Sequence, residues 1–305
     1  MKSALRLTEV TKYYGWRQKQ KALDQLSLEV PTGVICGLIG PNGAGKTTTF
    51  SLVGGFIQPD GGEIDILGGG GFDPERLKGR LGVLPQDAEL GDRHTPLEFL
   101  EHLARLQGLT AADARARAKT LLEQLNLGDR QARTIQSLSH GMRRRVAVAS
   151  ALIGDPELVL LDEPTSGLDP RQVLSLRQML DTYRGKTTLV VSSHVLTELE
   201  ALCDYVIFMD KGRCIRQGPI AEVTGRTQLL LWTLAIKPRD LRRLQDILPG
   251  HQLEWDGQTL SHRAPAAADL DEVSLIVTSF LSHEGIAIRE LRRGVSLEQS
   301  FMEGS

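Results

Sequence analysis

Hydrophobic and polar residues alternate along the first part of the chain in the way that half-buried strands require. The period of two is visible in LRLTEV (residues 5–10), ALDQLSLEV (22–30) and GEIDILG (62–68). Between them, GVICGLIG (33–40) is a continuous apolar run ending in glycine, which is typical of a strand covered on both faces of a parallel sheet. We therefore predict a β-rich region over residues 4–67.

The hydrophobic period becomes helical over residues 96–153. PLEFLEHLARLQGL places leucines at near-helical spacing behind Pro96, a favoured residue at the first helical position. AADARARAKTLLEQLNLG is rich in good helix formers and ends in Gly128. GMRRRVAVASALIGDP places apolar residues on one helical face and ends in a Gly-Asp-Pro stop signal. This region is predicted to be helical.

Two further buried-type strands, ELVLLDEP and TTLVVSSH, follow with a helical stretch between them, and YVIFMDKGRCIRQG has the pattern of a hairpin turning at Lys211-Gly212. From about Thr227 the predicted order is β-α-β-β-α-β, which matches the ferredoxin-like pattern. The segments are LLLWTLAI, PRDLRRLQDIL, HQLEWDGQTLSHRA, AADLDEVSLIVTSFLSHEG and IAIRELRR. We expect a main domain over residues 4–222 and a small accessory α+β domain over residues 227–305.

Composition limits the kinds of partner, compartment and membrane association that the chain can have. The formal net charge of −2 over 305 residues gives no sign of a nucleic-acid partner. Three cysteines without C-x-x-C spacing fit a reducing compartment. The longest charge-free run, Val30 to Gly45, contains two prolines and five glycines, whereas a spanning helix needs about 20 apolar residues. Any membrane span is therefore expected to come from another subunit.

The segment GPNGAGKT satisfies the pattern G-x-x-x-x-G-K-[ST], and it lies between a buried-type strand and a plausible helix. Glycines let the backbone wrap phosphates, since a Cβ would block the required turns. Lys46 is expected to reach the β- and γ-phosphates, and the Thr47 hydroxyl to ligate Mg²⁺. The alternative is a simple glycine-rich turn. The predicted nucleotide-binding residues here are Gly40, Pro41, Asn42, Gly43, Ala44, Gly45, Lys46, Thr47 and Thr48.

A second candidate segment, LVLLDEP, joins four apolar residues to two carboxylates. A buried strand that ends at Asp162 places that carboxylate near the metal. Glu163, the next residue, points elsewhere and is a candidate for polarising an attacking water. The alternative is a strand that ends in solvated acids.

The segment LSHGMRRRV places Ser139 and Gly141 at the mouth of an apparent helix, with three arginines in its first turn. Helix N-termini bind anions through free N–H groups, so this is a second candidate anion site. For Arg143, Arg144 and Arg145 two interpretations are open: a solvated helix face, or contact with phosphate or an acidic partner.

Together these residues resemble the ATP-binding subunits of ABC transporters. The Walker A segment is GPNGAGKTT, the Walker B segment is LVLLDEP, and LSHGM occupies the position of the signature. LPQD supplies Gln86 as a Q-loop residue, SGLD resembles the D-loop, and VSSH ends in His194 at the switch position. The match covers residues 4–220 in the order of the family. Taken singly, Gln86 is better explained as an ordinary loop glutamine, and His194 as a hydrogen-bonded histidine at a strand end.

The resemblance implies an α/β fold: a P-loop (RecA-like) ABC ATPase core with an antiparallel β portion and a helical subdomain at about residues 90–155. It implies ATP and Mg²⁺ as cofactors. The implied metal residues are Thr47, Gln86 and Asp162, and the implied catalytic residues are Glu163, His194 and Gln86. Ser139 and Gly141 are implied to contact the γ-phosphate.

Adenine stacking is implied for an aromatic residue just before Gly15. By position this is Tyr14, although Tyr13 and Trp16 lie close enough to be alternatives. A strand-end aromatic packed on the core is the other interpretation of Tyr14.

The signature departs from the usual L-S-G-G-Q, because His140 replaces its first glycine and Met142 its glutamine. A methionine cannot hydrogen-bond as an amide does, so a contact from this position to ribose is in doubt. With the additional C-terminal domain and the closing SLEQSFMEG, the chain resembles the exporter-type branch, whose membrane subunit is a separate chain.

We therefore expect an ATPase subunit that powers export through a membrane-spanning permease subunit by ATP-driven, head-to-tail dimerisation with a second ATP-binding subunit. The expected location is the cytoplasmic face of the membrane. Two alternatives are an ABC-type ATPase acting on ribosomes or DNA, and a P-loop kinase or GTPase. A single cassette without extended heptads argues against the first of these.

Overall fold

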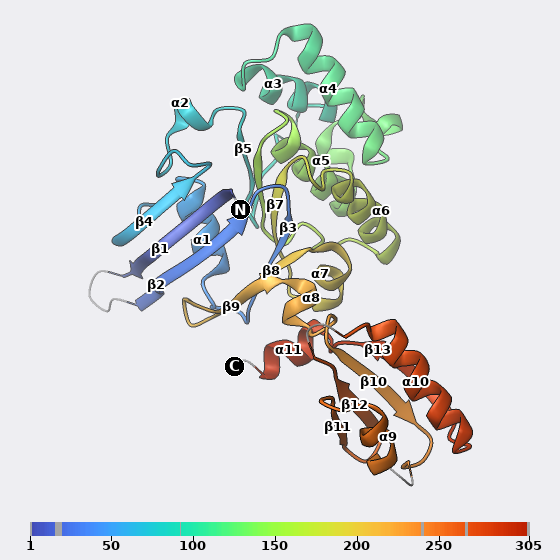
Figure 1. Cartoon of the computed structure of the whole chain (residues 1–305). Coiled ribbons are helices and arrows are strands. Elements are labelled where there is room, and N and C mark those ends of the chain that lie inside the picture. Colours follow the sequence, from blue (N-terminus) through green and yellow to red (C-terminus); the bar gives the residue numbers. More distant parts are fainter. Residues whose placement is uncertain (1, 16–19, 92, 239–240, 266–267, 304–305) are drawn as a thin grey trace. The chain divides into compact units, whose positions relative to one another are not determined.

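The computed structural model describes residues 2–15, 20–91, 93–238, 241–265 and 268–303. Its chain divides into two compact units, an N-terminal unit, Met1–Gln217, and a C-terminal unit, Gly218–Ser305 (Figure 1). Each unit is described by itself below.

One sheet of the N-terminal unit is antiparallel. Its described strands are β1 (Ser3–Tyr14), β2 (Gln20–Pro31) and β4 (Gly61–Ile66), in the order β2-β1-β4. In β2, Leu26, Leu28 and Val30 are buried while Ser27 between them is exposed. The alternation follows from the strand geometry, which directs successive side chains to opposite faces.

The other sheet of the N-terminal unit forms the centre of its fold. Its described strands run in the order β5-β6-β7-β3-β8-β9, and the pairs from β5 to β8 are parallel. Every residue of β3, β6 and β7 is buried, as expected for strands covered on both faces. The strands are β3 (Ile35–Ile39), β5 (Leu81–Leu84), β6 (Leu158–Leu161), β7 (Thr188–Ser192), β8 (Tyr205–Asp210) and β9 (Arg213–Pro219).

Helices connect these strands. Thr95 and Glu98 form a capping box at the start of the helix that begins at Pro96, and the Asp169 side chain caps the helix that begins at Pro170. Figure 1 shows α3 and α4 together at the top of this unit. The helices are α1 (Lys46–Val53), α2 (Pro74–Leu77), α3 (Pro96–Leu106), α4 (Ala111–Gln124), α5 (His140–Leu152), α6 (Pro170–Asp181) and α7 (Leu196–Leu202), with single 3-10 turns at Gly128–Arg130 and Ile135–Ser137.

The C-terminal unit has an antiparallel sheet in the order β11-β12-β10-β13. Its core contains Trp232, Leu260, Val277 and Leu281, which are fully buried. Between β10 and β13 the elements follow the order β-α-β-β-α-β. The elements are α8 (Ile220–Val223), β10 (Leu229–Leu234), α9 (Leu241–Ile247), β11 (Gln252–Trp255), β12 (Thr259–Arg263), α10 (Leu270–His283), β13 (Ile288–Arg293) and α11 (Leu297–Glu303).

This core also holds a buried histidine. His262 is 0% exposed, and its Nε2 lies 2.8 Å from Nδ1 of His251. Its own Nδ1 is buried and finds no hydrogen-bond partner within the described residues. Burial, reinforced by the neighbouring His251, lowers the pKa of His262 to about 4. His262 is therefore a neutral core residue at physiological pH.

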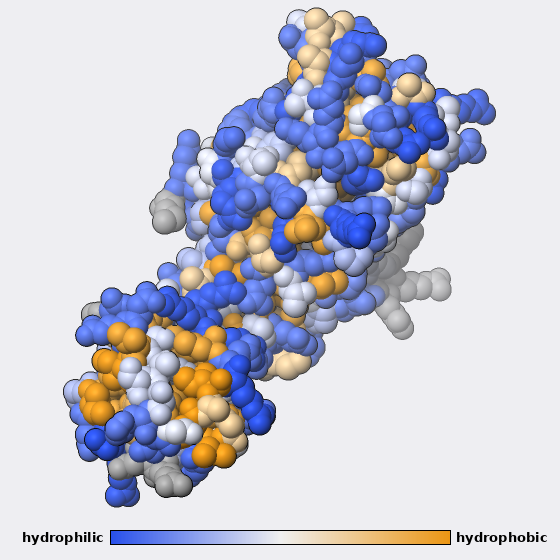
Figure 2. Space-filling view, turned by 90° about the vertical axis from the view of Figure 1, so that its right-hand side faces the viewer, coloured by the Kyte–Doolittle hydropathy of each residue, from blue (hydrophilic) through white to orange (hydrophobic). Residues whose placement is uncertain are grey.

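The surface of the C-terminal unit carries hydrophobic side chains, which gather on the face that Figure 2 shows. Exposed large apolar residues of this unit include Ile236, Ile247, Leu275, Leu291 and Met302. Among the helices that the structure describes, none is both long and apolar enough to cross a membrane.

The other strands and the long helices lie where the hydrophobic pattern predicts them, but strand β5 and four short helices were not expected. The helices are α2, α7, α8 and α11. A helix of four to seven residues spans two turns at most, so its hydrophobic period is too short to recognise in the sequence.

Candidate nucleotide-binding site

The predicted site residues gather at one edge of the parallel sheet. The Gly40–Thr48 segment follows β3, Gln86 follows β5, Asp162 and Glu163 follow β6, and His194 follows β7. These four strands are neighbours in the order β5-β6-β7-β3 and run parallel, so their carboxyl ends share an edge. In open α/β sheets, ligands bind in the crevice outside this edge.

The loop after β3 needs its glycines for two different reasons. A Cβ added to Gly40 would lie 2.3 Å from the carbonyl oxygen of Met209, so the close approach of β8 excludes a side chain. Gly45 has a φ of 102° and caps α1 in the left-handed conformation. Because glycine has no side chain to satisfy the first N–H groups of α1, they stay available to an anion.

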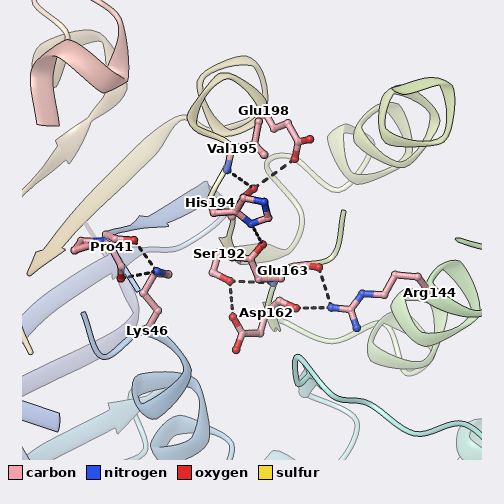
Figure 3. Close-up of polar contacts among 11 residues, drawn as sticks. Pro41, Lys46, Arg144, Asp162, Glu163, Ser192, His194, Val195 and Glu198 are labelled. Carbon is pink, nitrogen blue, oxygen red and sulfur yellow. Dashed lines mark hydrogen bonds and ion pairs between the residues drawn. The ribbon is translucent and has the colours of Figure 1, made fainter. Parts of the chain in front are cut away.

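Lys46 begins α1 and folds back onto the loop. Its Nζ donates to the carbonyl oxygens of Gly40, at 2.6 Å, and Pro41, at 3.1 Å (Figure 3). Burial lowers the pKa of Lys46, and the charges of Glu163 and Asp162 oppose that shift. The ammonium group therefore braces the loop and remains within electrostatic range of both carboxylates.

Asp162 is almost fully buried, at 1% exposed. Its Oδ1 accepts a hydrogen bond of 2.5 Å from the Ser192 hydroxyl, whereas its buried Oδ2 has no partner among the described residues. A buried carboxylate oxygen without a donor is costly unless a ligand completes it. The Asp162 carboxylate and the exposed side chains of Thr47 and Gln86 supply hard oxygen donors of the kind that Mg²⁺ prefers.

Glu163 has an unusual backbone for a residue with a side chain. Its φ is 52°, in the left-handed region, which costs roughly 1–2 kcal/mol for a residue with a Cβ. Its N–H donates to the Ser192 hydroxyl at 2.9 Å. Its Oε2 lies 2.7 Å from Nδ1 of His194. The side chain of Glu163 is 13% exposed and that of His194 is 65% exposed, so the pair extends from the protein toward solvent.

Ser139 and Gly141 lie at the start of α5, as predicted. The Ser139 hydroxyl caps the helix by accepting from the Met142 N–H at 3.3 Å. A Cβ on Gly141 would lie 2.2 Å from Oε1 of Gln172 in α6, so a side chain at this position would require Gln172 to move. Within the described part of the chain, neither residue makes a hydrogen bond to the loop of Lys46.

His140, which departs from the usual signature, lies against the SGLD segment. Its Cε1 is 2.5 Å from the position that a Cβ on Gly167 would occupy. Gly167 has a φ of 74°, so both its conformation and its contact with His140 favour glycine.

The interpretation as a solvated helix face is wrong for Arg144 and Arg145, which are 8% and 6% exposed. Their observed hydrogen-bond acceptors are main-chain carbonyls. Arg144 donates to main-chain carbonyls at the ends of β5 and β6, and Arg145 donates to the carbonyl of Leu125 at 2.6 Å. Arg143 is partly exposed.

Sequence reasoning missed Ser192 and Arg144. A signal was present for each. Ser192 is a polar residue that directly follows three buried apolar residues in strand β7. Arg144 precedes the buried residues Val148 and Ala151 by four and seven positions, which places it on the buried face of α5.

The remaining predicted residues lie at the surface. Tyr14 ends β1 and is 43% exposed, so it is not packed into the core, and its contact with adenine remains a prediction. Tyr13 is partly buried, and its N–H donates to Asp60 Oδ2 at 2.7 Å. Trp16 lies outside the described residues. The exposed Gln86 lines a cavity of about 550 Å³ between the segment after β5 and α5.

Comparison with known proteins agrees with this geometry. A family model described as ABC transporter matches residues 23–166. The daunorubicin/doxorubicin resistance ATP-binding protein DrrA of Streptomyces peucetius is 38% identical over 208 residues, which are 67% of this chain and 62% of that protein. The Nod factor export ATP-binding protein I of Ralstonia nicotianae is 34% identical over 295 residues, covering 95% of this chain and 90% of that protein.

A solved structure shares the fold. It is a dimeric, post-hydrolysis state of an ATP-binding cassette bound to ADP and Pi, with a TM-score of 0.65 and 26% identity over 71% of this chain and 98% of that one. The chain belongs to the ATP-binding subunits of ABC transporters. The predicted fold class is confirmed, and so are ATP binding and ATP hydrolysis as its activity.

Proposed function

We propose that this chain uses ATP hydrolysis to power export through a separate membrane-spanning subunit, at the cytoplasmic face of the membrane. One observation carries the proposal: the likeness to the Nod factor export ATP-binding protein extends over 95% of this chain, so it includes both units. The resistance protein DrrA supports the same assignment over 67% of the chain.

In this proposal the residues at the sheet edge divide the work on ATP. The N–H groups at the start of α1 and the Lys46 ammonium bind the phosphates. Thr47, Asp162 and Gln86 hold Mg²⁺, which when bound neutralises phosphate charge. Glu163 accepts a proton from the water that attacks the γ-phosphate, and His194, 2.7 Å from its carboxylate, orients that carboxylate.

The second anion site acts in a partner cassette. Ser139 and Gly141 at the start of α5 contact the ATP that is held by the Lys46 loop of a second copy, in a head-to-tail dimer with two-fold symmetry. Two observations support this. Neither residue bonds to its own Lys46 loop in the described part of the chain, and the related ADP-bound cassette is dimeric. ATP closes this dimer, and its hydrolysis lets the dimer open.

The membrane subunit is proposed to contact residues 87–100, beside the cavity at Gln86. A full-length tagged chain purified from detergent-solubilised membranes tests the export assignment, and an integral membrane protein should co-purify. Recovery of ribosomes or DNA instead would favour the alternative function.

Photo-crosslinking of the same complex tests the contact itself. A crosslinker at Glu89, which is exposed beside the cavity, should capture the membrane subunit. The same crosslinker at Lys119, an exposed position in α4, serves as the matched control and should not. Capture only from positions in residues 227–305 would contradict the proposed contact.

A further inference from the structure

Arg144 connects three parts of the site through its guanidinium group. It lies in α5, five residues after the signature Ser139, and is 8% exposed. Its Nη1 donates to the carbonyl oxygen of Gln86 at 3.0 Å. Its Nη2 donates to the carbonyl oxygens of Asp162, at 2.5 Å, and Glu163, at 2.9 Å (Figure 3). One side chain thus joins the segments after β5 and β6 to α5.

Burial of the Arg144 guanidinium is energetically unfavourable. Burying a guanidinium costs several kcal/mol, which proteins commonly offset with a carboxylate partner. Here the hydrogen-bond acceptors found in the described structure are main-chain carbonyls. The planar fork of arginine can reach several acceptors at once, whereas the single ammonium of a lysine cannot match that geometry. Burial lowers the pKa of Arg144, and the nearby charges of Asp162, Glu163 and Asp87 oppose that shift, while its hydrogen bonds hold the main chain.

The backbone that it fixes includes the peptide group between Asp162 and Glu163. The carbonyl oxygen of this peptide accepts from Arg144, and its N–H donates to the Ser192 hydroxyl. With both polar atoms held, the peptide plane cannot rotate freely. Turning this plane would change ψ of Asp162 and φ of Glu163 together, and the φ of Glu163 stands at 52°. The left-handed conformation of the proposed base is therefore maintained from two sides.

We propose that Arg144 is a positioning residue for ATP hydrolysis, which acts by holding the Asp162–Glu163 peptide so that the Glu163 carboxylate stays against His194. The inference rests on the proposed role of Glu163 as the base. Arg144 also links the helix that follows the signature to the residues proposed for hydrolysis in the same chain. A displacement of α5 would move the carbonyls of Glu163 and Gln86 through this one side chain.

A double-mutant cycle on the full chain tests this inference. Arg144→Lys keeps the charge but loses the fork, so we expect kcat to fall about 10-fold while KM for ATP changes less than about 2-fold. Glu163→Gln alone should lower kcat strongly. Because Arg144 acts through Glu163, Arg144→Lys should lower the single-turnover rate by less than about 2-fold in the Glu163→Gln background.

Arg145→Lys is the matched control. Arg145 is buried to a similar extent in the same helix, but it bonds to the carbonyls of Leu125 and Gly141 and not to those of Asp162 or Glu163. Any effect of this substitution on the rate should be the same with and without Glu163→Gln. Thermal unfolding of each variant shows whether it is folded. Arg144→Gln, which keeps one amide donor, provides a second cycle if Arg144→Lys is unstable.

The outcomes separate the inference from the function it rests on. Equal losses from Arg144→Lys in both backgrounds would show that Arg144 is only a structural support and would overturn the inference. An unchanged kcat in a folded Arg144 variant would do the same. Hydrolysis at the parental rate by Glu163→Gln would instead remove Glu163 as the base, whatever Arg144 does.

Discussion

Both units bury polar side chains, but the two sets differ in what they hold. In the N-terminal unit Arg144, Asp162 and Ser192 are buried. Arg144 donates to the main-chain carbonyl of Asp162, and the Ser192 hydroxyl donates to the Asp162 carboxylate, at the carboxyl ends of adjacent strands. In the C-terminal unit the buried polar residues include Thr224 and Ser300, which donate to the carbonyl oxygens of Ile220, at 2.7 Å, and Val223, at 2.8 Å.

The difference shows what distinguishes a site from a polar core. Thr224, the residue that follows α8, donates to the first carbonyl of that helix, and Ser300 links α11 to its last carbonyl. At the N-terminal site the same kind of bonds leave Asp162 Oδ2 buried without a partner in the described structure and keep Glu163 in a left-handed conformation. Unfavourable features of this kind, such as an unpaired polar atom or a strained backbone, are retained where binding of a ligand or catalysis requires them.

A buried polar atom without a hydrogen-bond partner is therefore not sufficient by itself to identify a functional site. His262 Nδ1 is also buried without a partner within the described residues, yet it lies in the hydrophobic core of the C-terminal unit near Trp232. The comparison predicts that substitutions in the first set change turnover, whereas substitution of His262 changes stability.

The largest expected effect is that of Lys46→Ala. Loss of the charge-assisted bonds to the phosphates should weaken ATP binding by about 100-fold, and turnover should fall to background. Titration with a fluorescent ATP analogue measures this. Lys78→Ala, at an exposed lysine of the same unit, is the control and should bind normally. Unchanged ATPase activity of Lys46→Ala would refute the nucleotide site.

A mixed dimer tests the site between two copies. Ser139→Arg should leave ATP binding by the monomer intact but block closure of the dimer, because the bulky cation fills the γ-phosphate contact. With Lys46→Ala on one subunit and Ser139→Arg on the other, both changes fall in one composite site and the second site is intact. ATP-dependent closure, measured by energy transfer between labelled subunits, should then survive in part.

The reverse arrangement provides the control for the mixed dimer. When one subunit carries both Lys46→Ala and Ser139→Arg and its partner is unchanged, each composite site contains one lesion. Closure should fail. Identical behaviour of the two arrangements would show that each copy completes its own site and that the head-to-tail geometry is wrong.

The smallest expected effect concerns the pH dependence of stability in the C-terminal unit. The folded pKa of His262, about 4, lies below its ordinary value of 6.5, so the unfolded state binds the proton more readily. This stabilising contribution is complete above pH 6.5 and is lost as the pH falls toward 4. Between pH 7.5 and 5 the loss should be about 2 kcal/mol.

Denaturant unfolding measures this contribution. In a Trp16→Phe background the remaining tryptophans, Trp232 and Trp255, both lie in the C-terminal unit and report its unfolding. His262→Gln should reduce the dependence on pH while leaving KM for ATP unchanged. If the pH dependence of His262→Gln equals that of the parent, His262 is not the titrating group.

Much of the secondary structure and part of the candidate site could be predicted from the sequence, because the patterns that indicate them lie within short segments. Alternating, continuous apolar and helical patterns predicted the long helices and the strands of both units except β5. The Gly40–Thr48 segment carries its own chemistry, since the loop residues that wrap a phosphate are contiguous. Asp162 and Glu163 were recognisable because they directly follow a buried strand.

Only the tertiary structure decided the role of Arg144 and the conformation of Glu163. In the sequence Arg144 is one of three adjacent arginines, and its acceptors are the carbonyls of Gln86, 58 residues away, and of Asp162 and Glu163, 18 and 19 residues away. Main-chain carbonyls are the same in every residue type, so no pattern of side chains marks which of them an arginine will reach. Their positions are set by the packing of α5 against the ends of β5 and β6, which is why the buried fork appears only in the folded chain.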